Sequence, residues 1–486
     1  MGNEKRQEVG VEQKRDIETD VAVIGAGASG LCAALTLSFG GVSVVIFEQE
    51  PEPGGMTNYA EGMFAVGSRL QKKKKVGLTV EEAFNTHMEE THWLANPRLV
   101  RTFMDKTADT IDWLESLGTQ FSGLFTISPL TPRVWHQLVG FGKEGLIAPL
   151  YQKAQSEKNI QVHFETEVKG LMTENGSVVG LVAQDKDGEV RVKAKAVVIA
   201  AGGYQDNKEW VDKYCKSGFT QPVVPGKHVG SGIQMAWDAG AEPYDMGVMQ
   251  TIVLVPGEDL SSQLLVAGYQ PGLWVNKLGE RFCNESICWK FPMAGNALAR
   301  QPGAAAWCIF DDDARTRMKD NGVQYVLGEF YDILKNLPDL DDELARGMSE
   351  GKVVRGGSLE ELAAQMDVDA ATLRETVDEY NQACAGNYDP IFGKDRVYLQ
   401  GIKTPTFWAV KLGLSCFMTN GGIRINHKTE VLREDRTVIS GLYAIGCSAG
   451  GIVGDTYEVS TTGGSLSFAV NTGRIAGETI LQRFGK

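Results

Sequence analysis

The residues with the clearest chemistry are three glycines near the N-terminus, in the string Gly25-Ala26-Gly27-Ala28-Ser29-Gly30. Gly25 permits a tight turn, Gly27 lets the backbone approach a pyrophosphate, and Gly30 lets a helix pack closely on a strand. Glu48 follows 18 residues after Gly30, at the spacing of an acid that accepts hydrogen bonds from ribose hydroxyls. A glycine-rich structural turn does not account for Glu48. The pattern therefore predicts a dinucleotide site with its phosphates at a helix N-terminus.

The elements that must position these residues are short strands and a helix. The β-rich run Asp20 to Ile24 precedes the glycines, helical spacing follows at Leu31 to Phe39, and a second strand is predicted at Val42 to Phe47. Two further β-rich runs, Ala196 to Ala201 and Leu442 to Gly446, also end in glycine-rich turns. We expect all four runs to lie in one parallel sheet.

The length of the chain predicts two domains. It has 486 residues, of which 43% are apolar, so each of two domains can bury a substantial core. The middle of the chain has no second phosphate-binding motif and includes a helical stretch at 359–384, preceded by a capping sequence at 358–361. We predict an α/β protein in which a discontinuous Rossmann-like domain, residues 1–228 and 400–486, receives an inserted α+β cap domain, residues 229–399.

Composition excludes several classes of partner. The 48 basic and 62 acidic residues give a net charge of −14, which repels nucleic acid and anionic membranes. The eight cysteines form no CxxC motif, so neither an iron–sulfur cluster nor an attached haem is expected, and no metal site is predicted. No secretory signal and no run of about 18 apolar residues is present. We expect a cytoplasmic protein without a membrane span, which receives electrons from a separate donor.

Several further blocks resemble the flavoprotein family of fumarate reductases and succinate dehydrogenases. The strings Pro53-Gly54-Gly55-Met56-Thr57 and Ala60-Glu61-Gly62-Met63 resemble the loop of that family that contacts the flavin. Four more blocks follow in family order: Glu167-Val168, Ala201-Gly202-Gly203, Thr419-Asn420-Gly421-Gly422-Ile423 and Gly441-Leu442-Tyr443-Ala444-Ile445-Gly446. The resemblance spans almost the whole chain and implies FAD, so that the Rossmann-like domain is an FAD-binding domain.

The same resemblance assigns the residues around the FAD. Glu48 is expected to hold the AMP ribose and Val168 the adenine. Family members with covalent flavin have a histidine just before the loop threonine, where this chain has Met56, so a non-covalent FAD is implied. The other residues expected to contact the cofactor are Gly25, Gly27, Ala28, Ser29, Gly30, Gly54, Gly55, Thr57, Gly62, Met63, Ala201, Gly202, Gly446, Gly464, Ser465 and Leu466.

Two segments of the cap resemble catalytic segments of soluble fumarate reductases. The segment Ile309 to Arg315 is similar to one that supplies an arginine acid, which implies that Arg315 donates the proton. An arginine is a reluctant acid because its pKa exceeds about 12, so a substrate ligand or a plain surface arginine is the alternative. The segment Gly279 to Glu285 implies that Glu285 lies near the substrate or the proton path. The family's relay arginine is absent, and Lys290 is the candidate replacement.

The dicarboxylate ligands of fumarate reductases are missing. Where the family has a histidine and an arginine, this chain has Phe417, Met418 and Thr461. Two buried carboxylates without cationic partners would cost several kcal/mol each, so fumarate is disfavoured and an apolar substrate wall is expected. The stretch Val453 to Tyr457 resembles 3-ketosteroid dehydrogenases, in which a tyrosine polarises a carbonyl. Tyr457 is therefore a catalytic candidate, although a tyrosine in such a loop can also serve only in packing.

These observations predict an FAD-dependent reductase that delivers hydride to an activated, largely uncharged ring. An enone, a steroid, or a flavonoid or isoflavonoid such as tetrahydrodaidzein fits, since tetrahydrodaidzein reductases are similar in kind. One alternative is a 3-ketosteroid-type dehydrogenase, in which Tyr457 or Glu458 is the base. Others are a fumarate reductase-like enzyme for another carboxylate, and a flavin carrier without turnover. A cap over the flavin argues against the carrier, because closure excludes water from a bound substrate.

Overall fold

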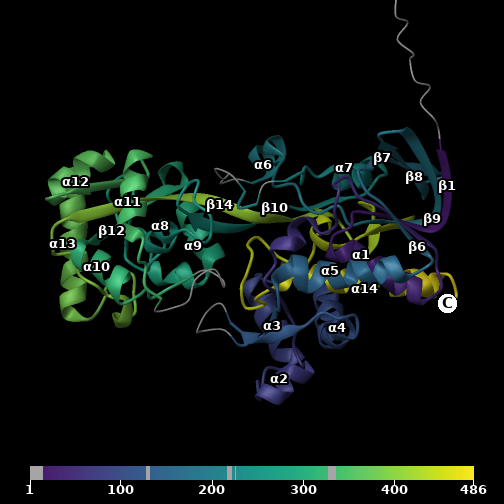
Figure 1. The fold of residues 1–486 in the computed structure, drawn as a ribbon, viewed down its shortest axis with the longest axis horizontal. Helices are drawn as coiled ribbons and strands as arrows, with labels where there is room; N and C mark the ends of the chain where they lie inside the picture. The colour runs from purple at the N-terminus through teal and green to yellow at the C-terminus, as the bar shows by residue number, and fades with distance from the viewer. Residues whose placement is uncertain (1–14, 127–131, 216–221, 225, 327–334) are drawn as a thin grey trace, which may run out of the picture.

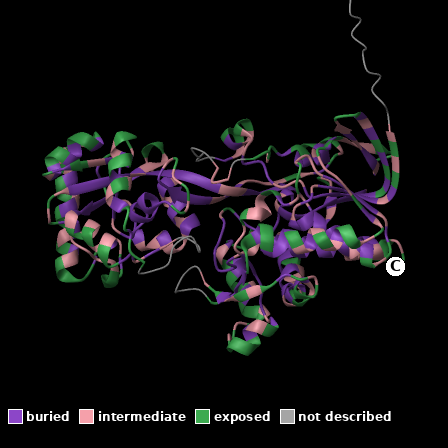
Figure 2. Ribbon diagram, in the orientation of Figure 1, coloured by how far each residue is buried: buried purple, intermediate pink, exposed green. Residues whose placement is uncertain are grey.

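The computed structural model describes residues 15–126, 132–215, 222–224, 226–326 and 335–486. The molecule is elongated, with the nucleotide-binding part at one end and the cap at the other (Figure 1). Two long antiparallel strands, β10 (Pro243–Leu254) and β14 (Phe407–Ile423), run from the cap toward the nucleotide-binding part. Both parts have buried interiors and exposed outer helix faces (Figure 2). Among the described helices, none is long and apolar enough to cross a membrane.

The nucleotide-binding part is built on an eight-stranded sheet. Its central strands are β1 (Arg15–Ile24), β2 (Val44–Phe47), β9 (Gly188–Ile199) and β16 (Val438–Ala444). Strand β1 pairs in parallel with β2 and β9, and β16 pairs in parallel with β9, which confirms the predicted parallel sheet. The sheet is completed by β6 (Ile160–His163), β7 (Glu167–Glu174), β8 (Ser177–Asp185) and β15 (Glu430–Leu432).

Helix α1 (Ala28–Phe39) follows the glycine motif and packs against the C-terminal helix α14 (Gly464–Arg483). Close contact is possible because α14 presents small residues to α1: a Cβ on Gly473 would lie 2.4 Å from the Ser29 carbonyl oxygen. Almost all of α1 is buried, as its apolar sequence requires. The last helix of the chain therefore supports the first nucleotide-binding element.

The cap contains a five-stranded sheet in the order β10-β14-β12-β11, with β13 beside β14. The remaining strands are β11 (Leu273–Asn276), β12 (Ala305–Asp311) and β13 (Val353–Gly356). Its helices are α8 (Gln263–Gly268), α9 (Phe291–Ala299), α10 (Asp312–Asp320), α11 (Leu340–Ser349), α12 (Leu359–Met366) and α13 (Ala370–Gly386). The predicted helical stretch 359–384 is thus two helices, because Asp367 adopts a left-handed conformation with φ 57°.

Strand β14 joins the two parts. Residues 407–413 of β14 pair with β12, and residues 413–423 pair with β10. The predicted domain boundary at 399/400 precedes this strand, whereas the sheet places the first half of β14 inside the cap. The chain therefore returns to the nucleotide-binding part along β14, and the residues at its C-terminal end lie where the two parts meet.

A smaller layer, which includes a third sheet, lies beside the nucleotide-binding part. It consists of a three-stranded sheet, β3 (Gly62–Phe64), β5 (Trp135–Leu138) and β4 (Phe121–Phe125), with the helices α3 (Val80–Glu90) and α4 (Pro97–Ser116). The remaining helices are α2 (Arg69–Lys74), α5 (Ala148–Ser156), α6 (Lys208–Tyr214) and α7 (Ser231–Asp238). The three-stranded sheet supplies Gly62 and Trp135 to a cavity between the nucleotide-binding part and the cap.

Candidate active site

A cavity of about 690 Å³ lies at the carboxyl ends of β1 and β2, where the glycine motif opens α1. Its size suits a large cofactor. Among the described residues that line it are twelve of the predicted cofactor contacts: Gly25, Gly27, Ala28, Ser29, Glu48, Gly54, Gly55, Met56, Thr57, Val168, Ala201 and Gly202. The nucleotide site predicted from the sequence therefore coincides with a cavity of suitable size.

Glu48 organises the wall of this cavity. Its carboxylate accepts hydrogen bonds from the backbone N–H groups of Ala26 at 2.8 Å and Glu50 at 3.0 Å. Burial raises the pKa of Glu48, while these two hydrogen bonds lower it, and the net direction is upward. The side chain thus holds the glycine loop in place, in addition to the ribose contact that the sequence predicts.

The residues present fit a bound dinucleotide. Gly27 caps α1 without a side-chain hydrogen bond, so the start of the helix faces the cavity with backbone donors for phosphate. A Cβ on Gly25 would lie 2.5 Å from the Ala200 carbonyl oxygen, so no larger residue fits there. Gln205 lines the cavity with both amide atoms buried and without a partner among the described residues. A bound polar group would satisfy this amide.

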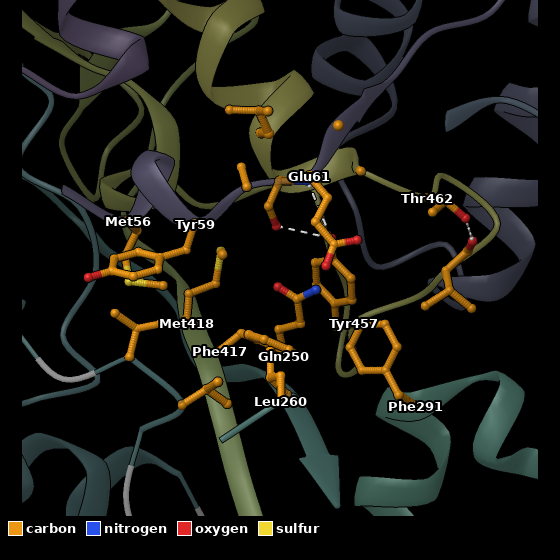
Figure 3. Close-up of a pocket in the computed structure, with 18 of the residues that line it drawn as sticks. Met56, Tyr59, Glu61, Gln250, Leu260, Phe291, Phe417, Met418, Tyr457 and Thr462 are labelled. Carbon is orange, nitrogen blue, oxygen red and sulfur yellow. Dashed lines mark hydrogen bonds between the residues drawn. The ribbon is translucent and has the colours of Figure 1, made fainter. Parts of the chain in front are cut away.

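A second cavity, of about 490 Å³, adjoins the first. Met56, Tyr59, Val224 and Met418 line both cavities. The second cavity lies between the nucleotide-binding part and the cap, with walls from β3, β10, α9, β14 and the loop before α14 (Figure 3). A substrate in this cavity would therefore meet one end of a cofactor in the first.

The walls of the second cavity are mostly apolar. Phe417 and Met418 line it as predicted, and the Phe417 ring packs edge-on against the Phe291 ring at a centroid distance of 5.7 Å. Among the described residues that line it, none is basic. Three acidic residues, Glu61, Glu258 and Asp259, also line it, and Glu258 already binds Arg346 at 2.7 Å and Lys352 at 2.7 Å. The described lining therefore offers no cation for a dicarboxylate, and the residues expected to form an apolar wall lie in it.

Tyr457 is one of the polar residues that line this cavity (Figure 3). Its hydroxyl oxygen accepts hydrogen bonds from the Ser465 backbone N–H at 3.3 Å and the Ser465 hydroxyl at 3.1 Å. Ser465 Oγ also lies 3.4 Å from Asn420 Oδ1, and apart from this hydroxyl no acceptor for the Tyr457 proton is found in the described part of the chain. Burial raises the pKa of Tyr457 to about 12, so the hydroxyl is protonated at neutral pH. The proton is available to an acceptor bound in the cavity.

Two further polar atoms in the cavity wall are buried and have no hydrogen-bond partner among the described residues. They are Nε1 of Trp135, on β5, and Oε1 of Gln250, on β10. Figure 3 shows Gln250 directed into the cavity from the side opposite Glu61. Buried polar atoms are nearly always paired in native proteins, so a bound molecule is the natural partner of these two.

The structure does not bring Arg315 to either cavity. It lies on α10, at the end of the cap far from the nucleotide-binding part (Figure 1). Its guanidinium binds Asp312 at 2.7 Å and also contacts Asp341, and these carboxylates raise its pKa. An acid so far from the cavity, and so firmly protonated, is unsuited to donate a proton there. The expectation of a catalytic Arg315 is corrected accordingly.

Glu285 also lies outside both cavities. It is fully buried inside the cap, where it binds Arg281 at 2.8 Å and Lys394 at 3.1 Å and accepts a hydrogen bond from the Trp274 backbone N–H at 3.3 Å. These contacts use both carboxylate oxygens within the cap. Glu285 is therefore part of a buried ion cluster that stabilises the cap. The expectation that it lies near the substrate or the proton path is corrected as well.

The other predicted residues fall into three groups. Gly30 and Gly446 serve packing: a Cβ on Gly30 would lie 2.0 Å from the Gly25 carbonyl oxygen, and one on Gly446 would lie 3.1 Å from Ser29 Oγ. Gly62, Ser465 and Leu466 line the apolar cavity, not the cofactor cavity. Met63, Thr461 and Gly464 line neither of these two cavities; Thr461 donates its hydroxyl to Glu458 instead of facing a substrate.

Several lining residues were not predicted. Three of them, His228, Trp135 and Gln250, come from segments with no motif, so no pattern in the sequence could have identified them. The fourth, Gln205, lies two residues after the Ala201-Gly202-Gly203 block, which is the signal that could have found it. Burial lowers the pKa of His228, whose backbone N–H donates to Asp206 at 3.1 Å. The Ala60 to Met63 string, predicted as a flavin loop, does supply Glu61 and Gly62 to the apolar cavity.

Comparison with known proteins agrees with this geometry. Residues 20–463 match the model of the FAD binding domain family, and the chain belongs to that family. A vinyl phenol reductase of Lactiplantibacillus plantarum is 30% identical, and the match covers 95% of this chain and 96% of the relative. The 3-ketosteroid Δ4-(5α)-dehydrogenase of Rhodococcus jostii has a similar structure, with a TM-score of 0.74, 25% identity, and coverage of 98% of this chain and 99% of that one.

The structure is also similar to that of a flavocytochrome c3 fumarate reductase in its open conformation. The TM-score is 0.73, the identity is 28%, and the match covers 96% of this chain and 78% of that one. The protein therefore binds FAD, and it is an oxidoreductase of the class that acts on CH–CH or C=C bonds. It is a member of the fumarate reductase-like and ketosteroid dehydrogenase-like flavoproteins.

Proposed function

We propose that this protein reduces a carbon–carbon double bond that is conjugated with an oxygen on a largely uncharged ring substrate. The observation that carries the proposal is the Tyr457 hydroxyl. It accepts two hydrogen bonds from Ser465, keeps its own proton available, and faces an apolar cavity that adjoins the FAD cavity. A phenol, an enone, a steroid, or a flavonoid or isoflavonoid such as tetrahydrodaidzein has the required oxygen.

Each residue of the cavity has a distinct part in this proposal. FAD, when bound in its reduced form, supplies hydride chemistry. Tyr457 donates a hydrogen bond to the substrate oxygen and stabilises the negative charge that develops there. Gln250 Oε1 accepts a hydrogen bond from a substrate hydroxyl. Phe291, Phe417 and Met418 contact the ring and exclude water, which strengthens the hydrogen bond from Tyr457.

The activities of two similar proteins support this substrate class. The Lactiplantibacillus plantarum relative is a vinyl phenol reductase, and the Rhodococcus jostii structure is a ketosteroid dehydrogenase in complex with 4-androstene-3,17-dione. A vinyl phenol and a ring enone both conjugate an alkene with an oxygen. Either oxygen could accept a hydrogen bond from the Tyr457 hydroxyl.

The reverse reaction, desaturation of a saturated ring ketone, is the second candidate because of the similarity to the ketosteroid dehydrogenase. Desaturation requires a base that removes a proton from carbon. Burial raises the pKa of Tyr457 to about 12, so its hydroxyl is a donor at neutral pH. The raised pKa of Tyr457 therefore favours reduction over desaturation.

An anaerobic screen tests the proposal. The photoreduced protein is mixed with a vinyl phenol, a ring enone, an isoflavonoid and fumarate, and the return of the oxidised flavin spectrum is followed. We expect reoxidation by the uncharged conjugated substrates and none by fumarate. The Tyr457→Phe variant should react about 100-fold more slowly with an unchanged flavin spectrum, because it loses one charge-stabilising donor. Reoxidation by fumarate alone, or dye reduction only with saturated ketones, would contradict the proposal.

Three further parts of the proposal concern the surroundings of the site. The FAD is non-covalent, since Met56 takes the position of the linking histidine, and denaturation should release it into the supernatant. Electrons come from a separate protein or cofactor donor. All eight cysteines are free in the structure, which suits a reducing, cytoplasmic location.

A further inference from the structure

A buried cluster of ionisable side chains lies behind Tyr457, outside the FAD and apolar cavities. His87, on α3, donates from Nδ1 to Glu458 Oε1 at 2.7 Å and from Nε2 to the Ile452 carbonyl oxygen at 2.6 Å. The side chains of His87 and Glu458 are each only 2% exposed. Glu458 also accepts hydrogen bonds from the hydroxyl groups of Ser460 and Thr461.

The contacts of His87 fix its protonation state. The carbonyl oxygen of Ile452 can only accept, so Nε2 carries a proton. Glu458 accepts from several donors and acts as a carboxylate, so Nδ1 carries a proton as well. His87 is therefore a buried imidazolium. The pKa of His87 is raised: burial lowers it, but the neighbouring Glu458 carboxylate raises it by more.

Glu90 lies one turn after His87 on α3, and its carboxyl group adjoins that of Glu458. Its Oε2 atom is buried and accepts from no donor in the described part of the chain. Two adjoining carboxylates repel each other, and one shared proton relieves the repulsion. Burial and Glu458 raise the pKa of Glu90, whereas His87 keeps that of Glu458 low despite its burial. A proton shared by the pair is therefore favoured on Glu90 over Glu458.

The cluster reaches the surface at one end. Glu90 binds Lys290 Nζ, at the start of α9 in the cap, at 3.4 Å, and the two side chains are 23% and 25% exposed. Lys290 is the charged group of the cap that contacts Glu90, and it lowers the pKa of Glu90. Solvent can therefore exchange protons with Glu90 without entering the substrate cavity.

The other end reaches Tyr457. A small cavity of about 10 Å³ is lined by His87, Glu458, Tyr457, Asn420 and Ser465. This is close to the smallest volume that holds one water, and the walls offer the polar partners that a buried water needs. One water in this cavity would complete a path of hydrogen bonds from Glu458 to the Tyr457 hydroxyl.

We propose that Glu90 and Glu458, with one water, return a proton from solvent to Tyr457 after each turnover. The proposal deepens the proposed function and rests on it. In the reduction of a conjugated enone, the β-carbon gains a hydride with two electrons from reduced FAD, and the oxygen gains the Tyr457 proton. The C=C and C=O π bonds, the tyrosine O–H bond and the donor's bond to the transferred hydrogen would break. A C–H bond, an enol O–H bond and a C=C π bond next to the oxygen would form, and the enol would become the saturated ketone by moving its proton from oxygen to carbon. Reduced FAD, when bound, would supply the two electrons. The tyrosinate then takes one proton from the Glu458–Glu90 pair, which solvent replaces.

His87 is a positioning residue in this scheme. Its positive charge keeps Glu458 ionised, so that the shared proton lies on Glu90, toward the surface. Lys290, from the cap, lowers the pKa of Glu90 and so favours loss of the shared proton. Among the described residues, Lys290 is the cap residue that forms an ion pair with this path.

Infrared spectroscopy of the oxidised protein at rest tests for the proton on Glu90 without any turnover. The carbonyl stretching band of a protonated carboxyl group should be present in the wild type and absent in Glu90→Gln. The matched control is Glu89→Gln, which removes an exposed carboxylate from the neighbouring position of α3 and should keep the band. In Lys290→Met the band should persist to higher pH, because Lys290 lowers the pKa of Glu90. A band that survives in Glu90→Gln overturns the proposal.

Kinetics then separate a relay from a structural effect. Tyr457 begins the first turnover protonated, so Glu90→Gln should reoxidise its flavin at nearly the wild-type rate in a single turnover with a ring enone. Its steady-state rate with a reduced dye as donor should fall at least tenfold. Equal losses in both experiments, or in neither, would overturn the relay. If no enone reoxidises even the wild-type flavin, the proposed function fails, whereas the infrared result still decides where the proton lies.

Discussion

The cofactor cavity and the substrate cavity adjoin, yet they are built in opposite ways. The cofactor cavity depends on backbone: glycines at positions 25, 27 and 54 and the start of α1 form its walls, and Glu48 fixes the loop through two N–H groups. The substrate cavity depends on side chains, such as Phe291, Phe417 and Tyr457, that come from separate segments. Backbone geometry leaves a motif in the sequence, whereas a set of converging side chains does not.

The largest effect is expected where the backbone has no room. In Gly30→Ala the new Cβ would lie 2.0 Å from the Gly25 carbonyl oxygen, so the glycine loop must move away from α1. We expect loss of most of the bound FAD, measured as the ratio of flavin to protein absorbance after purification. Gly77→Ala is the control, because nothing lies within 4 Å of its Cβ. Normal FAD content in Gly30→Ala would show that the cofactor cavity depends less on backbone than we infer.

A smaller effect is expected in the side-chain cavity. Phe417→Ala removes one apolar wall and its edge-on contact with Phe291. Loss of this burial should weaken substrate binding by about 1.5 kcal/mol, or roughly tenfold, with FAD content unchanged. Titration of the flavin spectrum with an unreactive ring ketone measures the change. Phe39→Ala, at an exposed position, should leave binding as it is. Unaltered binding in Phe417→Ala would place the substrate elsewhere.

The smallest effect is expected at Arg315. Its ion pairs with Asp312 and Asp341 are partly exposed, and such pairs contribute about 0–1 kcal/mol. Arg315→Ala should therefore keep turnover within about twofold of the wild type and lower Tm only slightly, as measured by steady-state assay and thermal unfolding. A loss of about 100-fold in turnover with an intact flavin spectrum would restore the proton-donor role that the resemblance implied.

Much of the fold could be predicted because hydrophobic periodicity reports local structure. The strands at Asp20 to Ile24 and Ala196 to Ala201 were expected in one parallel sheet, and β1 and β9 do pair in parallel. The boundary at 399/400 was less well placed, because β14 reads as a continuous buried run and belongs to the cap in its first half and to the junction in its second. Periodicity identifies a strand but not which neighbours it pairs with.

The catalytic residues were the least predictable. Arg315 and Glu285 lie in segments that resemble family motifs, yet α10 and the buried cap interior keep both away from the cavity. Tyr457 was predicted from a local string, and the fold gave it two donors from Ser465. No sequence motif identified His87 or Glu90 as functional residues, because their partner Glu458 lies more than 360 residues away in the chain.

The sequence by itself determined that a dinucleotide binds, and the resemblance of the loop after Pro53 to a flavoprotein family implied that it is FAD. Its glycine spacing, Glu48 and the loop after Pro53 specify where a backbone must bend and where it must approach a pyrophosphate, and these are local properties of the chain. Tertiary structure alone decided the chemistry on the other side of the flavin. Packing of α3, α9, β10, β14 and the loop before α14 sets which side chains face the apolar cavity and which ionisable groups lie behind Tyr457, and such distances depend on the whole fold.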